Sequence, residues 1–184
     1  FVETTTTGVY GTPDFNINEG FNILNKNPIP FHNLGGSWYH ISKSNDCNYL
    51  WLANRLWGLT VIDFRTAITL GLNTSETKLS KKFLNRFDYD FYFGVVANKF
   101  IIRSIHNKKI EIYGKGKQKK PFIDLQDVVD SLFNVINFKG NKKFNIFNQF
   151  SETISITQIT NWIKEIQKKY RKKGKVIHII NPRV

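Results

Sequence analysis

The order of apolar and polar residues along the chain predicts strands that alternate with helices. Short runs rich in β-branched and aromatic residues are typical of strands, and they alternate with stretches in which apolar residues recur at helical spacing. Strands are predicted at 1–6, 59–64, 110–113, 144–147 and 176–180, and helices at 39–57, 94–105, 125–136 and 155–170. Because such alternation is typical of sheets covered by helices, the sequence favours an α/β fold.

Two long stretches lack this pattern. Residues 16–37 are polar and contain several Gly and Pro residues, so we predict a long loop there. Residues 70–92 form a polar, Lys-rich excursion. At the edges of the predicted elements, Gly58 is placed to end the first helix, and Gly114-Lys-Gly116 predicts a turn.

The chain has 184 residues, enough for one domain, and 27 basic against 14 acidic side chains give a net charge of +13. Such an excess invites a nucleic-acid interpretation. However, the lysines are scattered over several segments, whereas dedicated nucleic-acid surfaces rely on Arg with aromatic partners. The pattern therefore favours a solvated surface, with a small polyanionic ligand and a nucleic acid as alternatives.

The single cysteine, Cys47, excludes a disulfide framework, and no apolar run is long enough for a membrane span.

The most informative pair of polar residues is Tyr39 and Lys43, which lie at i and i+4 of the first predicted helix and so share one face. A nearby ammonium group favours the phenolate and lowers the pKa of a tyrosine, which can then act as a base. Without further context, the pair is equally consistent with two solvated helix residues.

The pair follows Thr4-Thr5-Thr6-Thr7-Gly8-Val9-Tyr10-Gly11, where a hydroxyl at a strand end could bind the same substrate oxygen. The alternative is a β-rich edge whose hydroxyls bond to the backbone.

Together, Thr-Thr-x-Gly-Val-Tyr-Gly and Tyr-x-x-x-Lys resemble the extended short-chain dehydrogenase/reductase superfamily, of the NAD-dependent epimerase/dehydratase type. Within it the chain is most similar to the UDP-sulfoquinovose synthase family. The supporting strings recur in family order over the whole chain, and they include residues 10–13, 39–43, 85–90, 113–116, 147–150 and 181–184.

The resemblance implies the C-terminal part of a Rossmann-type, doubly wound parallel sheet with a small substrate-binding α/β subdomain. Residues 1–71 would end the NAD-binding domain and carry the catalytic groups, and residues 72–184 would mainly bind the nucleotide sugar. Because the chain starts at Phe1 and lacks the Gly-rich NAD fingerprint, we expect a fragment that alone binds NAD poorly and does not turn over. The full-length protein is expected to be a homodimer in the plastid stroma or the bacterial cytoplasm.

The family's reaction uses NAD as a recycled oxidant, and the resemblance implies no metal. UDP-glucose is oxidised at C4, water is lost across C5 and C6, sulfite adds at C6, and hydride returns to C4. By resemblance Tyr39 is the base, Lys43 holds the nicotinamide ribose, and Thr6 holds the C4 oxygen. His40 is a proton carrier at C5 or C6, or else an ordinary helix residue. Cofactor contacts are further implied for Thr66 and Thr69.

Substrate contacts are implied at two segments and at three basic residues. The segments are Phe93-Gly94-Val95-Val96, at a helix start suited to phosphate, and Glu111-Ile112-Tyr113, a strand that meets uracil. Core packing is the alternative for Phe93 and Tyr113. The basic residues implied to meet the substrate's phosphates are Arg65, Lys120 and Arg183.

Two departures from the family pattern bear on activity. Arg65-Thr66-Ala67 stands where the family has Asn-Gln-Gly. Lys120 stands where the family has an arginine, and a lysine cannot bind a phosphate through two parallel hydrogen bonds as an arginine does. Two other readings therefore stay open. One is a different NAD-dependent nucleotide-sugar epimerase or dehydratase, and the other is a degenerate, non-catalytic relative.

Overall fold

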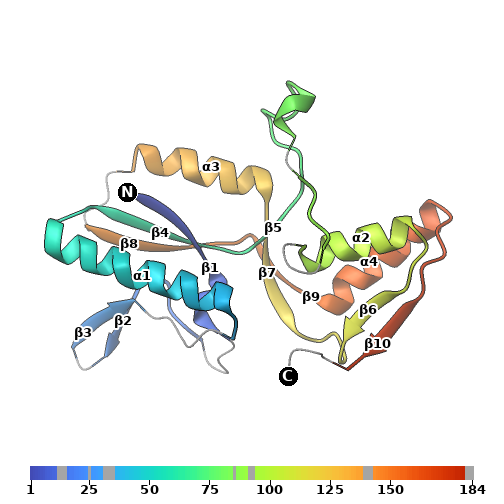
Figure 1. Ribbon diagram of the computed structural model, residues 1–184, viewed down its shortest axis with the longest axis horizontal. Coiled ribbons are helices and arrows are strands. Elements are labelled where there is room, and N and C mark those ends of the chain that lie inside the picture. Colours follow the sequence, from blue (N-terminus) through green and yellow to red (C-terminus); the bar gives the residue numbers. More distant parts are fainter. Residues whose placement is uncertain are drawn as a thin grey trace. The chain divides into compact units, whose positions relative to one another are not determined.

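The computed structural model describes residues 1–11, 16–24, 26–30, 36–84, 86–90, 94–138 and 143–180. The chain divides into two compact units (Figure 1). The first comprises residues 1–69 and 127–150, and the second comprises residues 70–126 and 151–184. The expected functional division at residue 71 stays a prediction.

A parallel sheet organises the first unit. Strand β4 (Val61–Thr66) lies between β1 (Val2–Thr6) and β8 (Phe144–Gln149), and all three run in the same direction. Thr6 is in register with Thr66, and Thr66 with Gln149, so the carboxyl ends of the three strands share one edge. In open α/β sheets ligands bind outside this edge.

Two helices lie on opposite sides of this sheet, α1 (Trp38–Trp57) and α3 (Leu125–Ile136) (Figure 1). Helix α1 begins at Ser37, whose side chain accepts a hydrogen bond from the His40 backbone N–H at 3.3 Å. It ends at Gly58, whose left-handed φ of 66° confirms the predicted cap. The arrangement matches the expected doubly wound sheet.

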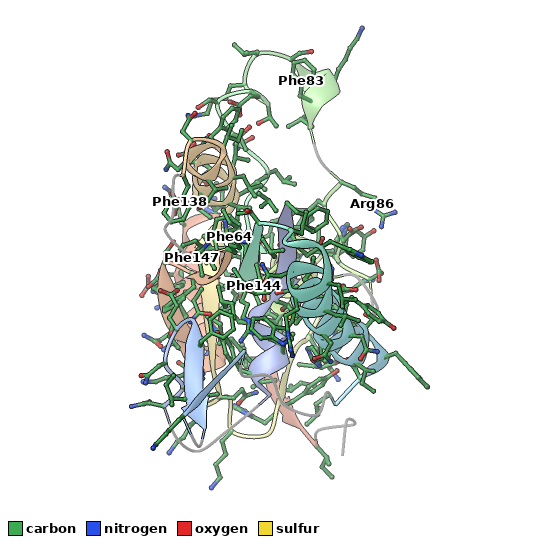
Figure 2. All side chains as sticks on the ribbon, turned by 90° about the vertical axis from the view of Figure 1, so that its left-hand side faces the viewer. Phe64, Phe83, Arg86, Phe138, Phe144 and Phe147 are labelled. Carbon is green, nitrogen blue, oxygen red and sulfur yellow. The ribbon has the colours of Figure 1, made fainter. Side chains whose placement is uncertain are left out.

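The alternation of side chains along β4 separates two aromatic clusters. Val61 faces the α1 side, where Leu50, Phe144 and Ile146 form a buried core with Phe21 and Trp51 packed against it. Phe64 faces the other side. Its ring lies 5.9 Å from that of Phe147, which in turn lies 5.5 Å from Phe138, and the three gather together in Figure 2.

The expected long loop at 16–37 is wrong over part of its length, because β2 (Phe21–Leu24) and β3 (Asn27–Pro30) form an antiparallel hairpin. The Phe21 ring packs 5.3 Å from Trp51 and 5.6 Å from Phe144. These residues are distant in sequence, so local polarity hides the contact that anchors the hairpin to the first unit's core.

In the second unit, β6 (Ile110–Tyr113) pairs in parallel with β10 (Val176–Ile179), and α2 (Val96–Ile105) packs against β6 and α4 (Ile156–Lys169). A capping box between Ser155 and Gln158 starts α4. These four elements confirm the predicted ones. Among the described residues, no helix combines the length and the apolar character that crossing a membrane requires.

Besides the hairpin of β2 and β3, three strands were not predicted, and the described residues also form two short 3-10 turns. Strand β7 (Lys119–Asp124) pairs antiparallel with β9 (Glu152–Ser155) in the second unit, and β5 (Ile68–Leu70) leads into that unit. Strand β7 begins Lys-Lys-Pro, a composition that disfavours a strand except at an edge or at a strand's start. The turns are η1 (Thr7–Tyr10) in the first unit and η2 (Lys81–Phe83) in the second.

Candidate functional site

Lys43 is held against the first strand of the sheet by Glu3 and Thr4, and Asp46 on its own helix adds a second carboxylate. Its Nζ atom lies 3.4 Å from Oε1 of Glu3 and 3.3 Å from Oδ2 of Asp46, and it donates to the carbonyl of Thr4 at 3.3 Å. Partial burial by itself would lower the pKa of Lys43, but the hydrogen bonds and charges of Asp46 and Glu3 outweigh it, and the pKa is raised. The side chain therefore remains an ammonium at neutral pH.

Tyr39 lies one helical turn before Lys43 and is open to solvent. Its side chain is 55 % exposed, and its ring meets that of His40 in an edge arrangement with centroids 5.5 Å apart. An exposed phenol beside an ammonium on the same helix face is accessible to a substrate in a way that a core tyrosine is not.

Thr6 ends β1 and caps the short η1 turn. Its Oγ1 accepts a hydrogen bond from the Gly8 N–H at 3.1 Å. A hydroxyl that accepts through its oxygen can still donate its proton, so Thr6 can offer a hydrogen bond to a substrate oxygen. The preceding residue, Thr5, is committed to the core instead, where its hydroxyl donates to Asp63 at 2.5 Å.

The η1 turn also brings Gly8 against His40. A Cβ atom added to Gly8 would lie 2.5 Å from both Cδ2 and Nε2 of His40, a distance that real Cβ contacts do not show. On its other side the His40 ring places Nδ1 3.1 Å from the hydroxyl of Ser37. The four predicted catalytic residues thus gather around the carboxyl end of β1 and the start of α1, namely Thr6, Tyr39, His40 and Lys43.

The two residues predicted to contact the cofactor are Thr66, on β4, and Thr69, on β5. Thr66 ends β4 beside Thr6 in register, and its hydroxyl donates to Oε1 of Gln149 at 2.7 Å. Thr69 lies half-buried in β5. Arg65, predicted to meet the substrate, is fully buried in the first unit, and its Nε donates to Oδ2 of Asp63 at 3.3 Å.

Sequence reasoning missed the buried polar network around Asp63. This carboxylate accepts from Thr5, from Arg65 and, at 3.4 Å, from the thiol of Cys47. Burial and the charge of Asp63 raise the pKa of Cys47 to about 12. The available signal was the pair of opposite charges two residues apart inside an apolar strand, because positions 63 and 65 must face the same side.

The second unit holds the remaining predicted substrate contacts. Gly94 and Val95 precede α2, and a Cβ on Gly94 would lie 2.5 Å from the carbonyl oxygen of Asp90, so only glycine fits there. Val96 begins the helix and is half-buried. Phe93 and Arg183 lie outside the described residues.

Strand β6 and the residue Lys120 complete this set. Glu111 forms an ion pair with Arg103 at 3.0 Å, Ile112 is buried, and Tyr113 is half-buried with its carbonyl accepting from Gln118. Lys120 is exposed on β7. The functional roles of all these residues stay predictions.

Comparison with known proteins supports the family resemblance. The chain is 31 % identical to the chloroplastic UDP-sulfoquinovose synthase of Spinacia oleracea, over 97 % of the chain and 38 % of the relative. It is 32 % identical to a UDP-sulfoquinovose synthase of Sulfolobus acidocaldarius, over 97 % of the chain and 47 % of the relative. The chain therefore spans less than half the length of these relatives. No protein-family model matches it.

The fold is shared with solved nucleotide-sugar enzymes. A UDP-glucuronic acid 4-epimerase from Bacillus cereus, solved in complex with UDP-glucuronic acid and NAD, superposes with a TM-score of 0.71. The two are 17 % identical, and the match covers 98 % of this chain and 48 % of the epimerase. The α/β fold class is confirmed, and so is the similarity of this chain to UDP-sulfoquinovose synthases.

Proposed function

We propose that the full-length gene product carrying this chain is an NAD-dependent nucleotide-sugar enzyme of the UDP-sulfoquinovose synthase type. It would make UDP-sulfoquinovose from UDP-glucose and sulfite through a 4-keto intermediate. The observation that carries the proposal is the gathering of Thr6, Tyr39, His40 and Lys43 at the carboxyl end of β1. The names of the two sequence relatives supply the product, UDP-sulfoquinovose, and the substrates and the reaction are those that the family resemblance implies.

Tyr39 acts as the base in this proposal. As a phenolate it takes the proton of the C4 hydroxyl of the sugar while hydride leaves C4, so the carbon is oxidised to a ketone. Lys43 lies on the same helix face, one turn further along α1. The Thr6 hydroxyl donates to the C4 oxygen and holds it in place for both the forward and the returning step.

His40 carries the protons of the dehydration. Its ring follows Tyr39 on α1 and is fixed between Gly8 and Ser37. An imidazole has a reference pKa near neutrality, so it can remove the C5 proton and return one as water leaves from C6. Sulfite then forms its carbon–sulfur bond at C6, and a proton is returned at C5 before C4 is reduced.

The residues around Lys43 fit a nicotinamide ribose. The ammonium is partly exposed and lies one turn from Tyr39, so it could exchange one of its present acceptors for a ribose hydroxyl and donate to that hydroxyl instead. Thr66 and Thr69 would add hydroxyl contacts. When bound, NAD supplies the hydride acceptor. These residues place the ribose beside the base.

Substrate recognition is assigned to the second unit. Residues 94–96 would present backbone N–H groups at the start of α2 to the diphosphate, and residues 111–113 would meet uracil. Lys120 and Arg183 would add positive charge for the same diphosphate. Full-length protein would pair as a homodimer, which light scattering of the purified protein would test.

The test is sulfite-dependent product formation by the full-length gene product. Incubation with UDP-glucose, NAD and sulfite should yield a UDP-sugar in which a sulfonate group replaces the C6 hydroxyl, and mass spectrometry detects the resulting gain in mass. Tyr39→Phe should abolish it, whereas Tyr49→Phe, an exposed tyrosine on the same helix, should not. Conversion of UDP-glucose without sulfite would favour another epimerase or dehydratase, and no reduction of NAD at all would favour a non-catalytic relative.

A further inference from the structure

Arg65 is an unusual residue for a sheet interior, since its side chain is fully buried and carries a permanent charge. We infer that Arg65 is a positioning residue. Through Tyr10 it fixes the η1 turn that carries Thr6 and Gly8 at the proposed active site. This inference rests on the proposed function for its catalytic consequence, and on the structure alone for its geometry.

The first step is charge neutralisation within one strand. Asp63 and Arg65 lie two residues apart on β4 and therefore face the same side, and both are fully buried. The Asp63 carboxylate accepts from Nε of Arg65 on one oxygen and from the hydroxyl of Thr5 on the other. Since the Arg65 side chain has no exposed surface among the described residues, a phosphate group could reach it only if the surrounding side chains moved.

The second step is the contact between Arg65 and Tyr10. The Cζ atom of Arg65 lies 4.6 Å from the centroid of the Tyr10 ring, within the range of a cation–π interaction. Beyond the ring, the Tyr10 hydroxyl donates to Oδ1 of Asn148 on β8 at 2.6 Å. Tyr10 is therefore held at its face by β4 and at its hydroxyl by β8.

The η1 turn is short, so a movement at one of its residues affects the others. This turn has only four residues, begins at the cap provided by Thr6, contains Gly8 and ends at Tyr10. The N–H of Gly11 donates back to the Gly8 carbonyl at 3.1 Å and closes the turn. A turn this short cannot shift at Tyr10 without also shifting Gly8 against the His40 ring and the hydrogen bond from Gly8 to Thr6.

The resemblance placed Arg65 among the substrate contacts, and its surroundings favour the positioning role instead. A phosphate ligand and a positioning residue differ in what their loss changes. Loss of a residue that binds phosphate weakens the binding of UDP. Loss of a positioning residue moves the turn and slows the reaction, with UDP bound as before.

The experiment compares Arg65→Met, Arg65→Lys and Tyr10→Leu in the full-length gene product, with Arg55→Met, an exposed arginine at the end of α1, as the matched control. UDP affinity is measured by calorimetry, the imidazole signals of His40 by NMR, and kcat and KM with UDP-glucose. We expect Arg65→Met and Tyr10→Leu to shift the His40 signals and to lower kcat by about tenfold or more, with UDP affinity changed less than about twofold.

The double variant that combines Arg65→Met with Tyr10→Leu should lower kcat little more than either single variant, because both substitutions act through the same turn. Arg65→Lys, which keeps the charge beside Asp63, should recover part of the lost kcat, and Arg55→Met should resemble the unchanged protein. A tenfold loss of UDP affinity in Arg65→Met with unmoved His40 signals would overturn the inference. If the protein proves to have no turnover, the His40 signals and the UDP affinity still decide the geometry. If Arg65→Met does not fold, Tyr10→Leu gives the same test.

Discussion

The imidazole of His40 lies so close to Gly8 that a Cβ atom at residue 8 would stand 2.5 Å from Nε2 of the ring. One residue is at the start of α1 and the other is in the η1 turn after β1, so this contact joins the two elements that carry the candidate active site.

Gly8→Ala should displace the His40 ring or the turn. Overpacking of this kind costs about 1–3 kcal/mol of unfolding free energy. We expect the NMR signals of His40 to move and turnover in the full-length protein to fall. Gly36→Ala is the matched control, because a Cβ there meets nothing within 4 Å. Equal stability and unchanged His40 signals in both variants would contradict the close approach.

Asp63→Asn should be strongly destabilising because it leaves the Arg65 charge buried without its carboxylate partner. Breaking a buried ion pair in this way costs about 3–5 kcal/mol. The partly exposed pair of Arg103 and Glu111 provides the comparison, since Glu111→Gln should cost less than about 1 kcal/mol. Urea unfolding measures both. Similar small losses for the two variants would show that Asp63 does not neutralise Arg65.

Cys47 should make the fold sensitive to alkaline pH. Burial raises the pKa of its thiol to about 12, so between pH 9 and 12 the folded state keeps a proton that the unfolded state has lost. The stabilisation is therefore complete below the ordinary thiol pKa and declines as pH rises, by about 1.4 kcal/mol per pH unit in that range. Urea unfolding at two alkaline pH values should show a smaller decline in Cys47→Ala. An equally steep decline in that variant would assign the effect to other groups.

Lys43→Met should separate catalysis from folding. The ammonium is partly exposed, and its pairs with Glu3 and Asp46 are of the surface kind, worth about 0–1 kcal/mol in unfolding free energy. Turnover by the full-length protein should nevertheless fall by orders of magnitude, because the proposed ribose contact and the field on Tyr39 are lost. Thermal unfolding and NADH absorbance together provide the measurement. Retained turnover would remove Lys43 from the mechanism.

The local sequence pattern was sufficient to predict an element when the residues that define it all lie within that element. The periodicity of 39–57 and Gly58 after it predicted α1 almost to its ends, and Ile110–Tyr113 and Leu125–Ile136 were predicted with the bounds observed. The spacing of Tyr39 and Lys43 placed both on one helix face because the helical repeat requires it. The order of motifs along the chain was enough to identify the family resemblance.

Contacts between distant residues decided the rest. The hairpin of β2 and β3 depends on Phe21 reaching Trp51 and Phe144, and local polarity had predicted a loop there. Thr5 and Asp63 are 58 residues apart, and Tyr10 and Asn148 are 138 residues apart, so no local pattern reveals that these groups share one buried network.

By itself, the sequence determined the four main helices and the strands that alternate with them, the Thr and Tyr-x-x-x-Lys motifs, and the presence of an arginine at residue 65. The tertiary structure alone decided where that arginine lies. Burial of its charge is tolerated only because folding brings an aspartate on the same strand, the hydroxyl of Thr5 from a second strand and the ring of Tyr10 from a turn around the same place.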